Sequence, residues 1–417
     1  MGQQATATVA ETLLDRFSAT RTLSCDLVAP LSDADATIQS MPDASPAKWH
    51  LAHTTWFLET FVLRDFVDDY EAFNPAYAYL FNSYYDAEGE RHARPRRGML
   101  ARPALDDVLA YRAHVDAAVT AAWPRLPAHA RELVELGCHH EAQHQELLLT
   151  DILHAFAQNP MLPAIWPRPR NVPAPAPGPV EWIEGAHGVV NIGHDARGFA
   201  FDCEGPRHSV FLHRHALADR LVTNHDWQDF IDDGGYRRPE FWLSEGWAWV
   251  QANAIAAPLY WEEAGTAFAL DGLHPRHPAA PVAHVSHYEA DAYARWAGAR
   301  LPIEAEWESA AATLDAESGN QLDVAGPVRP RAATGTGLRQ MFGDVWQWTG
   351  SAFLPYPGFA VAAGAVGEYN GKFMSGQMVL RGASCATPRG TSRATTRNFF
   401  PPHTRWQFAG LRLAKDL

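Results

Sequence analysis

Apolar residues recur every three to four positions in four segments of the N-terminal part of the chain. The segments cover residues 11–23, 47–66, 105–123 and 130–156. This spacing places the apolar side chains along one face of an α-helix. Four helices that each need a partner for that face predict a helical bundle.

A long segment, residues 74–103, separates the second predicted helix from the third and is rich in Tyr, Arg and Pro. Loops of this length in a compact domain are usually functional or disordered. The many aromatic residues argue against disorder. We therefore expect a functional loop.

The pattern changes beyond a proline-rich stretch at residues 167–179, which no helix or central strand could cross. Short β-like runs, such as residues 189–193 and 379–381, then alternate with Gly and Pro turns, and helical patches interrupt them at 224–232 and 288–298. We therefore predict a multidomain protein with an α part and an α+β part. The predicted organisation is a helical bundle at residues 1–166, a Pro-rich linker at 167–180 and an α+β domain at 181–417.

Length, charge and cysteine usage narrow the class of protein. The 417 residues exceed what one compact core usually holds. Lys and Arg number 34 against 48 Asp and Glu, and the net charge of −14 argues against binding to duplex nucleic acid. The 4 cysteines are scattered without a C-x-x-C, which favours a reducing cytoplasm over a disulfide framework. With no visible signal peptide and no apolar stretch of membrane-spanning length, we expect a cytoplasmic protein without membrane or nucleic-acid partners.

Three histidines are candidates to share one metal ion. His140 and His144 lie four residues apart in the fourth predicted helix, so they project from the same face. His53 lies in the second predicted helix, and side chains from facing helices of a bundle converge on its core. Three imidazoles would occupy one face of an octahedron and leave positions open for substrate and O2. Iron oxygenases have such open facial sites, with a carboxylate where this chain would have a third histidine.

The same residues allow two other interpretations. His140-Glu141-x-x-His144 matches the H-E-x-x-H signature of zinc hydrolases, in which Glu141 would be the general base. The extended metzincin form of that signature requires Gly and His where this chain has Leu147 and Thr150. The second interpretation is that the histidines are ordinary residues of the helix surface and bind no metal.

Seven short motifs follow one another along nearly the whole chain. They are WHLAHTTW at residues 49–56, LFNSYY at 80–85, HEAQHQE at 140–146, RLPIEAEWE at 300–308, GDVWQWT at 343–349, LRGAS at 380–384 and GLRL at 410–413. In this order and spacing they resemble the EgtB-type sulfoxide synthases of ergothioneine biosynthesis. The resemblance implies a DinB-like four-helix bundle fused to a formylglycine-generating-enzyme-like (sulfatase-modifying factor) domain with a C-type-lectin-like fold. It also implies an enzyme that uses O2 to join a thiol to the imidazole of Nα-trimethylhistidine (hercynine), giving a sulfoxide.

The resemblance assigns roles to residues of both domains. It makes His53, His140 and His144 the ligands of an Fe(II) ion. Gln143 matches a residue that holds the carboxylate of hercynine, and Asn398 matches one that contacts the same substrate from the second domain. The active site would therefore lie between the domains, where small-molecule pockets are common.

The residue at position 400 bears on the identity of the thiol. Relatives that use γ-glutamylcysteine carry an acidic residue where this chain has Phe400. An aromatic ring there removes the partner of a second substrate's ammonium group, so we expect free cysteine, with γ-glutamylcysteine as the alternative. Phe399 and Phe400 are also candidates to pack against the quaternary ammonium group of hercynine.

The loop between the second and third helices supports the same thiol. Tyr84 and Tyr85 resemble the catalytic tyrosines of the subgroup that accepts cysteine. Arg94 and Arg97 are the candidate anchors for the cysteine carboxylate, because guanidinium groups bind carboxylates through paired hydrogen bonds.

Other functions stay open at this stage. An ovothiol-type synthase would attach sulfur to a different imidazole carbon of histidine, but those chains typically carry an additional methyltransferase domain. A zinc hydrolase or a DinB-like thiol transferase would use the same histidines. A binding module without catalysis is also compatible with a lectin-like fold, although it would leave the three histidines unexplained.

Overall fold

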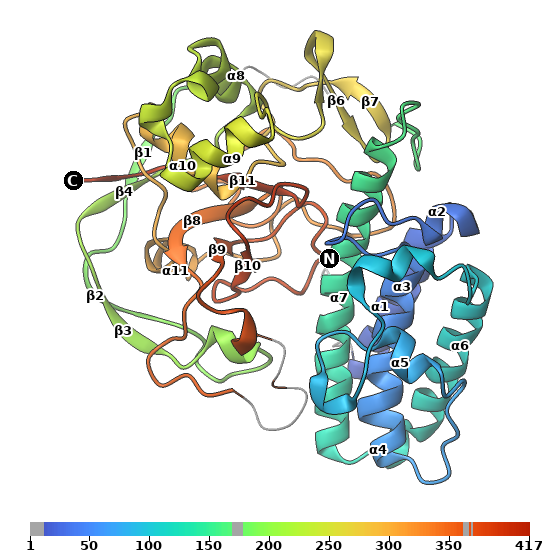
Figure 1. Ribbon diagram of the computed structural model, residues 1–417. Coiled ribbons are helices and arrows are strands. Elements are labelled where there is room, and N and C mark those ends of the chain that lie inside the picture. Colours follow the sequence, from blue (N-terminus) through green and yellow to red (C-terminus); the bar gives the residue numbers. More distant parts are fainter. Residues whose placement is uncertain (1–11, 169–177, 362–366, 368–369) are drawn as a thin grey trace, which may run out of the picture.

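The computed structural model describes residues 12–168, 178–361, 367 and 370–417. Its N-terminal helices stand side by side, and helix α7 lies between them and the C-terminal domain (Figure 1). The bundle contains α1 (Leu13–Val28), α2 (Asp33–Thr37), α3 (Ala47–Leu58), α4 (Arg64–Phe66), α5 (Tyr77–Phe81), α6 (Leu105–Ala122) and α7 (Ala128–Ala157). The four helices predicted from the apolar spacing are confirmed as α1, α3 with α4, α6 and α7.

Helix α3 is the central element of the bundle. All of its residues are buried, and it packs against α1, α6 and α7. A helix that is enclosed on every side can place polar side chains in the interior only where they find partners. One turn of π-helix, Glu59–Leu63, joins α3 to α4.

The long segment between α3 and α6 is folded. It contains α5 and a 3-10 helix, Arg94–Met99. The Phe81 carbonyl at the end of α5 faces the interior of the bundle, where it contacts His53 of α3. The segment is therefore tied to the bundle interior at the start of the predicted functional loop.

In its described residues, the C-terminal domain combines short strands with four α-helices. The helices are α8 (Asn224–Asp232), α9 (Ser244–Ala252), α10 (His287–Trp296) and α11 (Glu304–Ala311). The strands are β1 (Trp182–Glu184), β2 (Gly188–Ile192), β3 (His208–Leu212), β4 (His215–Ala218), β5 (Trp261–Glu262), β6 (Thr266–Ala269), β7 (Gly272–Pro275), β8 (Trp346–Ala352), β9 (Met378–Arg381), β10 (Asn398–Phe400), β11 (Ala409–Leu411) and β12 (Ala414–Asp416).

The largest sheet among the described residues has four strands in the order β10-β9-β8-β11. Its strand pairs are antiparallel except β8 with β11. Smaller sheets have the orders β1-β4-β12, β2-β3 and β5-β6-β7. The four-stranded sheet matters for the site because β10 carries Asn398, Phe399 and Phe400.

The two parts of the molecule share one apolar core. A single buried cluster includes Leu149 and Ile152 of α7 together with Phe268, Cys385 and Phe408 of the C-terminal domain. Burial of this much apolar surface stabilises the contact between the parts. Helix α7 is thus held from both sides.

The predicted linker at 167–180 contains residues 169–177, which lie outside the described part of the chain. The bundle ends with α7 at Ala157, and the first strand begins at Trp182. The domain boundaries at 166 and 181 stay predictions. Among the described residues, no helix combines the length and the apolar character needed to cross a bilayer.

Candidate metal centre and adjoining cavity

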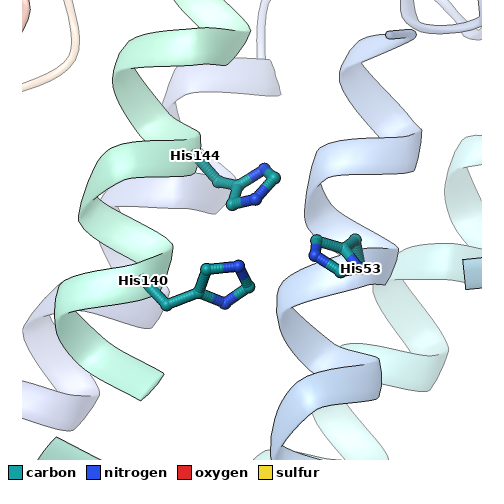
Figure 2. Close-up of side chains that lie close together, drawn as sticks. All are labelled: His53, His140 and His144. Atoms are coloured by element: carbon teal, nitrogen blue, oxygen red, sulfur yellow. The ribbon is translucent and has the colours of Figure 1, made fainter. Parts of the chain in front are cut away.

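Three histidine side chains converge in the core of the bundle. His140 and His144 extend from one face of α7 toward His53 on the facing helix α3 (Figure 2). One ring nitrogen from each lies within 4.8 Å of the other two. Among the described residues, this is the one group of three His, Cys, Asp or Glu side chains close enough to hold a metal ion.

Burial keeps these imidazoles neutral. It lowers the pKa of His140 to about 4. Burial, aided by the nearby His140, lowers the pKa of His53 and His144 well below the usual value. The neutral imidazole is the form that binds metals, because only it has a free lone pair.

The surroundings of His53 fix the orientation of its ring. Its Nδ1 lies 2.6 Å from the Phe81 carbonyl oxygen. A carbonyl only accepts hydrogen bonds, so Nδ1 carries the proton and Nε2 keeps its lone pair. The ring also stacks between Trp49 and Trp56, at centroid distances of 4.7 and 5.6 Å. A set of neutral imidazoles oriented in this way fits a divalent transition-metal ion.

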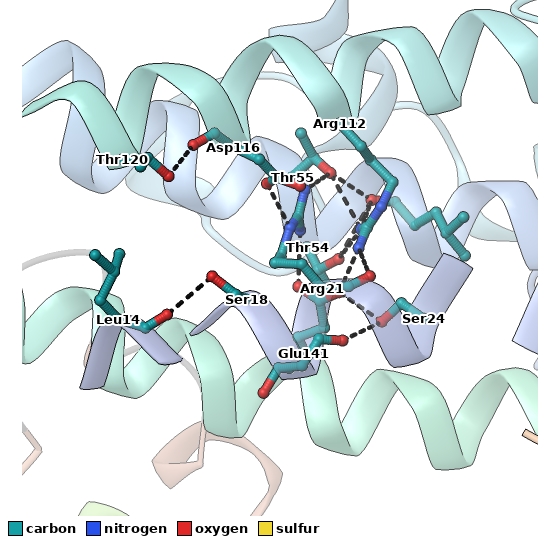
Figure 3. Close-up of polar contacts among 12 residues, drawn as sticks. Leu14, Ser18, Arg21, Ser24, Thr54, Thr55, Arg112, Asp116, Thr120 and Glu141 are labelled. Carbon is teal, nitrogen blue, oxygen red and sulfur yellow. Dashed lines mark hydrogen bonds and ion pairs between the residues drawn. The ribbon is translucent and has the colours of Figure 1, made fainter. Parts of the chain in front are cut away.

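Glu141 of the H-E-x-x-H sequence points into a different part of the bundle (Figure 3). Its carboxylate accepts hydrogen bonds from Arg21 Nη1 at 2.7 Å and Arg112 Nη2 at 2.7 Å, and from Ser24 Oγ at 2.5 Å. Burial opposes its ionisation, but Arg112 and Arg21 outweigh that effect and lower the pKa of Glu141 to about 2. A carboxylate held by two guanidinium groups is a poor general base. The geometry therefore disfavours the zinc hydrolase interpretation.

A cavity of about 390 Å3 lies between α7 and the C-terminal domain. Six of the residues predicted to act on substrates line it, namely Tyr84, Arg94, Gln143, Asn398, Phe399 and Phe400. The three histidines do not line the cavity. His140 and His144 lie on the side of α7 that faces the bundle, and His53 lies on α3 (Figure 2). Helix α7 thus contributes the histidine cluster on one side and a cavity wall on the other.

The two predicted catalytic tyrosines occupy different environments. Tyr84 lines the cavity, and its hydroxyl accepts a hydrogen bond from Arg94 Nη1 at 2.6 Å. Tyr85 is buried among bundle aromatics and does not line the cavity. Its ring centroid lies 5.5 Å from that of Trp56 and 6.5 Å from that of His53. Tyr84 therefore adjoins the cavity, and Tyr85 adjoins the histidine cluster.

The two candidate arginine anchors are also separated. Arg94 lines the cavity and forms no ion pair with a described carboxylate. Arg97 is 4% exposed and lies outside the cavity, with its guanidinium carbon 3.3 Å from the ring centroid of Trp49. Its nitrogens donate to Ser45 Oγ and Ser83 Oγ. Of the two arginines, only Arg94 has the access to the cavity that a substrate anchor requires.

The sequence patterns did not single out Glu146, which lines the cavity and connects α7 to the C-terminal domain. Its carboxylate accepts hydrogen bonds from Trp346 Nε1 at 2.8 Å, Ser384 Oγ at 2.5 Å and Thr387 Oγ1 at 2.7 Å. The one available signal was its place at the end of the HEAQHQE motif. An acidic residue on a helix is too common to be selected from spacing alone.

Comparison with known proteins covers both parts of the chain. The DinB superfamily model matches residues 16–148, and the sulfatase-modifying factor enzyme 1-like domain model matches 176–324 and 315–417. These matches confirm the predicted fold class, with the helical domain first.

The most informative relatives match nearly end to end. The hercynine oxygenase of Mycolicibacterium smegmatis is 33% identical over 434 residues, covering 98% of this chain and 99% of the relative. That of Mycobacterium tuberculosis is 33% identical over 409 residues, covering 92% and 94%. The formylglycine-generating enzyme of Streptomyces coelicolor is 30% identical over 241 residues but covers 44% of this chain.

Proposed function

The chain belongs to the hercynine oxygenase family and is an oxidoreductase, and from that premise we propose that it is an Fe(II)- and O2-dependent sulfoxide synthase. It joins cysteine to the imidazole of hercynine and forms hercynylcysteine sulfoxide for ergothioneine biosynthesis. One observation carries the proposal. Three neutral imidazoles converge in the bundle core, and the helix that carries two of them also forms a wall of the cavity lined by residues of both domains.

The overall reaction balances with O2 as the sole oxidant. The thiol loses its hydrogen, the imidazole carbon loses its hydrogen, and a C–S bond forms between them. One oxygen atom of O2 becomes the sulfoxide oxygen, and the other leaves as water with the two hydrogens. O2 thereby accepts the four electrons that the thiol and the imidazole give up.

His53, His140 and His144 would hold the iron. When bound, Fe(II) would supply O2 activation and a positive charge that favours the thiolate form of cysteine. The protein's contribution is to bring thiol and imidazole together in one site. Holding two reactants in a productive geometry is worth up to about 7–11 kcal/mol of the barrier in favourable cases.

Hercynine is proposed to bind in the cavity between Gln143 and Asn398. The Asn398 Oδ1 accepts the Phe399 backbone N–H at 2.8 Å, so its NH2 group can donate to the hercynine carboxylate. The quaternary ammonium cannot donate hydrogen bonds and is stabilised by aromatic faces. Phe400 and Trp406 supply such faces in the same cavity, with ring centroids 6.4 Å apart.

Cysteine is proposed to bind through its carboxylate to Arg94. The described partners of the Arg94 guanidinium are neutral oxygens, those of the Tyr84 hydroxyl and the Asp43 carbonyl. Its positive charge is therefore available to an anionic ligand. Phe400 offers no carboxylate to a second ammonium group, which supports cysteine over γ-glutamylcysteine.

A tyrosine is proposed to deliver a proton or hydrogen atom during oxygen reduction. The Arg94 bond occupies an acceptor position of the Tyr84 hydroxyl, so its own O–H can point elsewhere in the cavity. Tyr85 is the candidate on the side of the histidines. Both residues stay in the proposal because each adjoins one half of the site.

Product analysis tests the reaction directly. The protein is loaded with Fe(II) without oxygen and mixed with hercynine and either cysteine or γ-glutamylcysteine. Air is then admitted, and the product mass is read. We expect hercynylcysteine sulfoxide, formed faster from cysteine. A faster reaction with γ-glutamylcysteine would contradict the thiol assignment alone, and a product from unmethylated histidine would favour the ovothiol-type alternative.

Three variants and one control test the residues. His140→Ala is expected to lose stoichiometric iron, whereas His154→Ala, which removes another histidine of α7, retains it. Tyr84→Phe and Tyr85→Phe are each expected to lower sulfoxide formation and to divert the thiol toward a dioxygenated product. Unchanged product ratios in both tyrosine variants would show that this loop takes no part in the reaction. Full iron binding by His140→Ala would show that the histidine cluster is not the iron site.

A further inference from the structure

A buried chain of side chains leads away from the histidine cluster. His50 of α3 lies with its Nδ1 2.9 Å from Nδ1 of His144. On its other side, His50 Nε2 lies 3.1 Å from Oδ2 of Asp151. The three residues are between 3% and 8% exposed. Polar groups buried this deeply need defined partners, and these three supply them to one another.

The Asp151 carboxylate at the end of this chain decides which ring nitrogens of His50 and His144 carry protons. An ionised carboxylate only accepts hydrogen bonds, so His50 Nε2 is the donor to Asp151. A neutral His50 then presents a lone pair at Nδ1. The proton between the two rings therefore belongs to Nδ1 of His144, and the lone pair of His144 lies at Nε2.

We propose that Asp151 is a positioning residue that acts through His50 to hold His144 in the tautomer that can bind a metal. This inference rests on the proposed function, in which His144 is a ligand. Asp151 follows His144 by seven residues, so both lie on one face of α7, two turns apart. His50 spans the distance between them from the neighbouring helix.

The position of Asp151 is itself fixed. Its Oδ2 accepts the Ser45 backbone N–H at 2.7 Å. The Ser45 hydroxyl accepts a hydrogen bond from Arg97 Nη1 at 2.9 Å, and Arg97 lies over Trp49. Arg97 is thus part of the support of the metal centre. This role explains why it is buried away from the cavity.

The tautomers of His53 and His144 are fixed by different groups. The tautomer of His53 is fixed by the Phe81 backbone carbonyl, which a side-chain substitution cannot remove. The tautomer of His144 depends on His50 and Asp151, which can be changed by mutation. The proposal is therefore open to a direct test.

Asp151→Leu is the informative substitution. Ser45 N–H and His50 Nε2 both contact Oδ2 of Asp151, so the amide oxygen of an Asn could accept from both, whereas Leu offers neither group an acceptor. Without that acceptor nothing holds the His50 proton at Nε2, and a proton at His50 Nδ1 opposes the Nδ1 proton of His144. The expected result is a loss of about 10–100-fold in metal affinity, the usual effect of removing an outer partner of a ligating histidine. Co(II), titrated against a chelator and followed by its visible spectrum, is the probe.

A double-mutant comparison tests the route through His50. In a His50→Ala background, Asp151→Leu is expected to change Co(II) affinity less than about 2-fold, because residues that act as one unit do not give additive effects. Wild-type affinity in Asp151→Leu, or independent losses that multiply in the double variant, would overturn the proposal. His154→Gln is the matched control on α7, since it removes the bond between His154 Nδ1 and Ser40 Oγ.

A measurement on the unaltered protein covers the case in which Asp151→Leu does not fold. Imidazole 15N chemical shifts of the metal-free wild-type chain report which ring nitrogen carries the proton. His144 protonated at Nδ1 and His50 protonated at Nε2 are expected. His144 protonated at Nε2 would overturn the proposal. A wild-type chain that binds no Co(II) would instead contradict the metal centre of the proposed function.

Discussion

Helix α7 carries two carboxylates that lie five residues apart in very different surroundings. Glu141 faces the bundle interior, is 2% exposed and contacts Arg21 and Arg112. Glu146 is half-buried at the cavity wall and contacts three uncharged donors of the C-terminal domain. The pKa of Glu141 is lowered to about 2 because the arginines outweigh burial. Burial outweighs the neutral donors at Glu146 and raises its pKa.

The difference shows how the two sides of α7 are held. The bundle side is tied by buried ions, each of which depends on its counterion. Removing one partner of a buried pair leaves an uncompensated charge. The cavity side is tied by hydroxyl and indole groups, and a hydroxyl can reorient when its partner changes. A single substitution is therefore expected to cost more on the bundle side of α7 than on the cavity side.

The largest effect is expected for Glu141→Gln. This variant leaves Arg112 without a described carboxylate partner, since Glu141 is its one ion pair among the residues the structure describes. Arg21 retains Asp116 at 2.6 Å. We expect a loss of about 3–5 kcal/mol in the free energy of unfolding, measured by urea denaturation with circular dichroism.

Glu135→Gln provides the control on the same helix. Glu135 lies 3.7 Å from Arg16, and both side chains are substantially exposed. An exposed pair of this kind contributes about 0–1 kcal/mol. A loss below about 1 kcal/mol in Glu141→Gln, comparable to the control, would show that the buried network does not hold the bundle as argued.

The fold could be predicted where it depends on local periodicity. The spacing of apolar residues located α6 and α7 to within a few positions, because helix burial repeats along the sequence. It missed the π-helical turn at Glu59–Leu63, which has no distinct periodicity. It also could not pair the strands, since β11 joins β8 and β12 joins β4 across long stretches of chain. Three-residue strands carry too little pattern to indicate their partners.

Some residues of the candidate site could likewise be predicted from local sequence patterns, and others could not. The i, i+4 spacing of His140 and His144 is a local signal, and it pointed to the cluster that the structure contains. Asp151 and Glu146 gave no such signal because their partners lie on other elements. The sequence of the loop at 74–103 likewise could not separate the environments of Arg94 and Arg97. Whether a guanidinium reaches the cavity or an indole ring is decided by tertiary packing.

A smaller effect is expected for Glu146→Gln. The amide replaces an acceptor-only carboxylate, so at least one of the bonds from Trp346, Ser384 and Thr387 is lost or weakened. Reorientation of the hydroxyls limits the damage. We expect a loss of about 1–3 kcal/mol, with faster hydrogen exchange in the backbone of residues 384–387.

Glu132→Gln is the control for this variant, because Glu132 and its neighbour His129 are both exposed on α7. Unchanged exchange at residues 384–387 in Glu146→Gln would mean that the apolar contacts between the domains suffice without this carboxylate. A loss as large as that of Glu141→Gln would remove the distinction between the two sides of the helix.

The smallest effect is expected for Lys372→Met, at a third contact between the domains. Lys372 Nζ donates to the Tyr84 carbonyl oxygen at 2.5 Å and lies 3.3 Å from Asp86 Oδ2. The two charged side chains are 31% and 64% exposed, so water and salt screen their attraction. We expect the free energy of unfolding to change by about 0–1 kcal/mol, while hydrogen exchange rises in residues 82–89. A loss above about 2 kcal/mol would mean that an exposed contact fixes the tyrosine loop as firmly as the neutral donors fix Glu146.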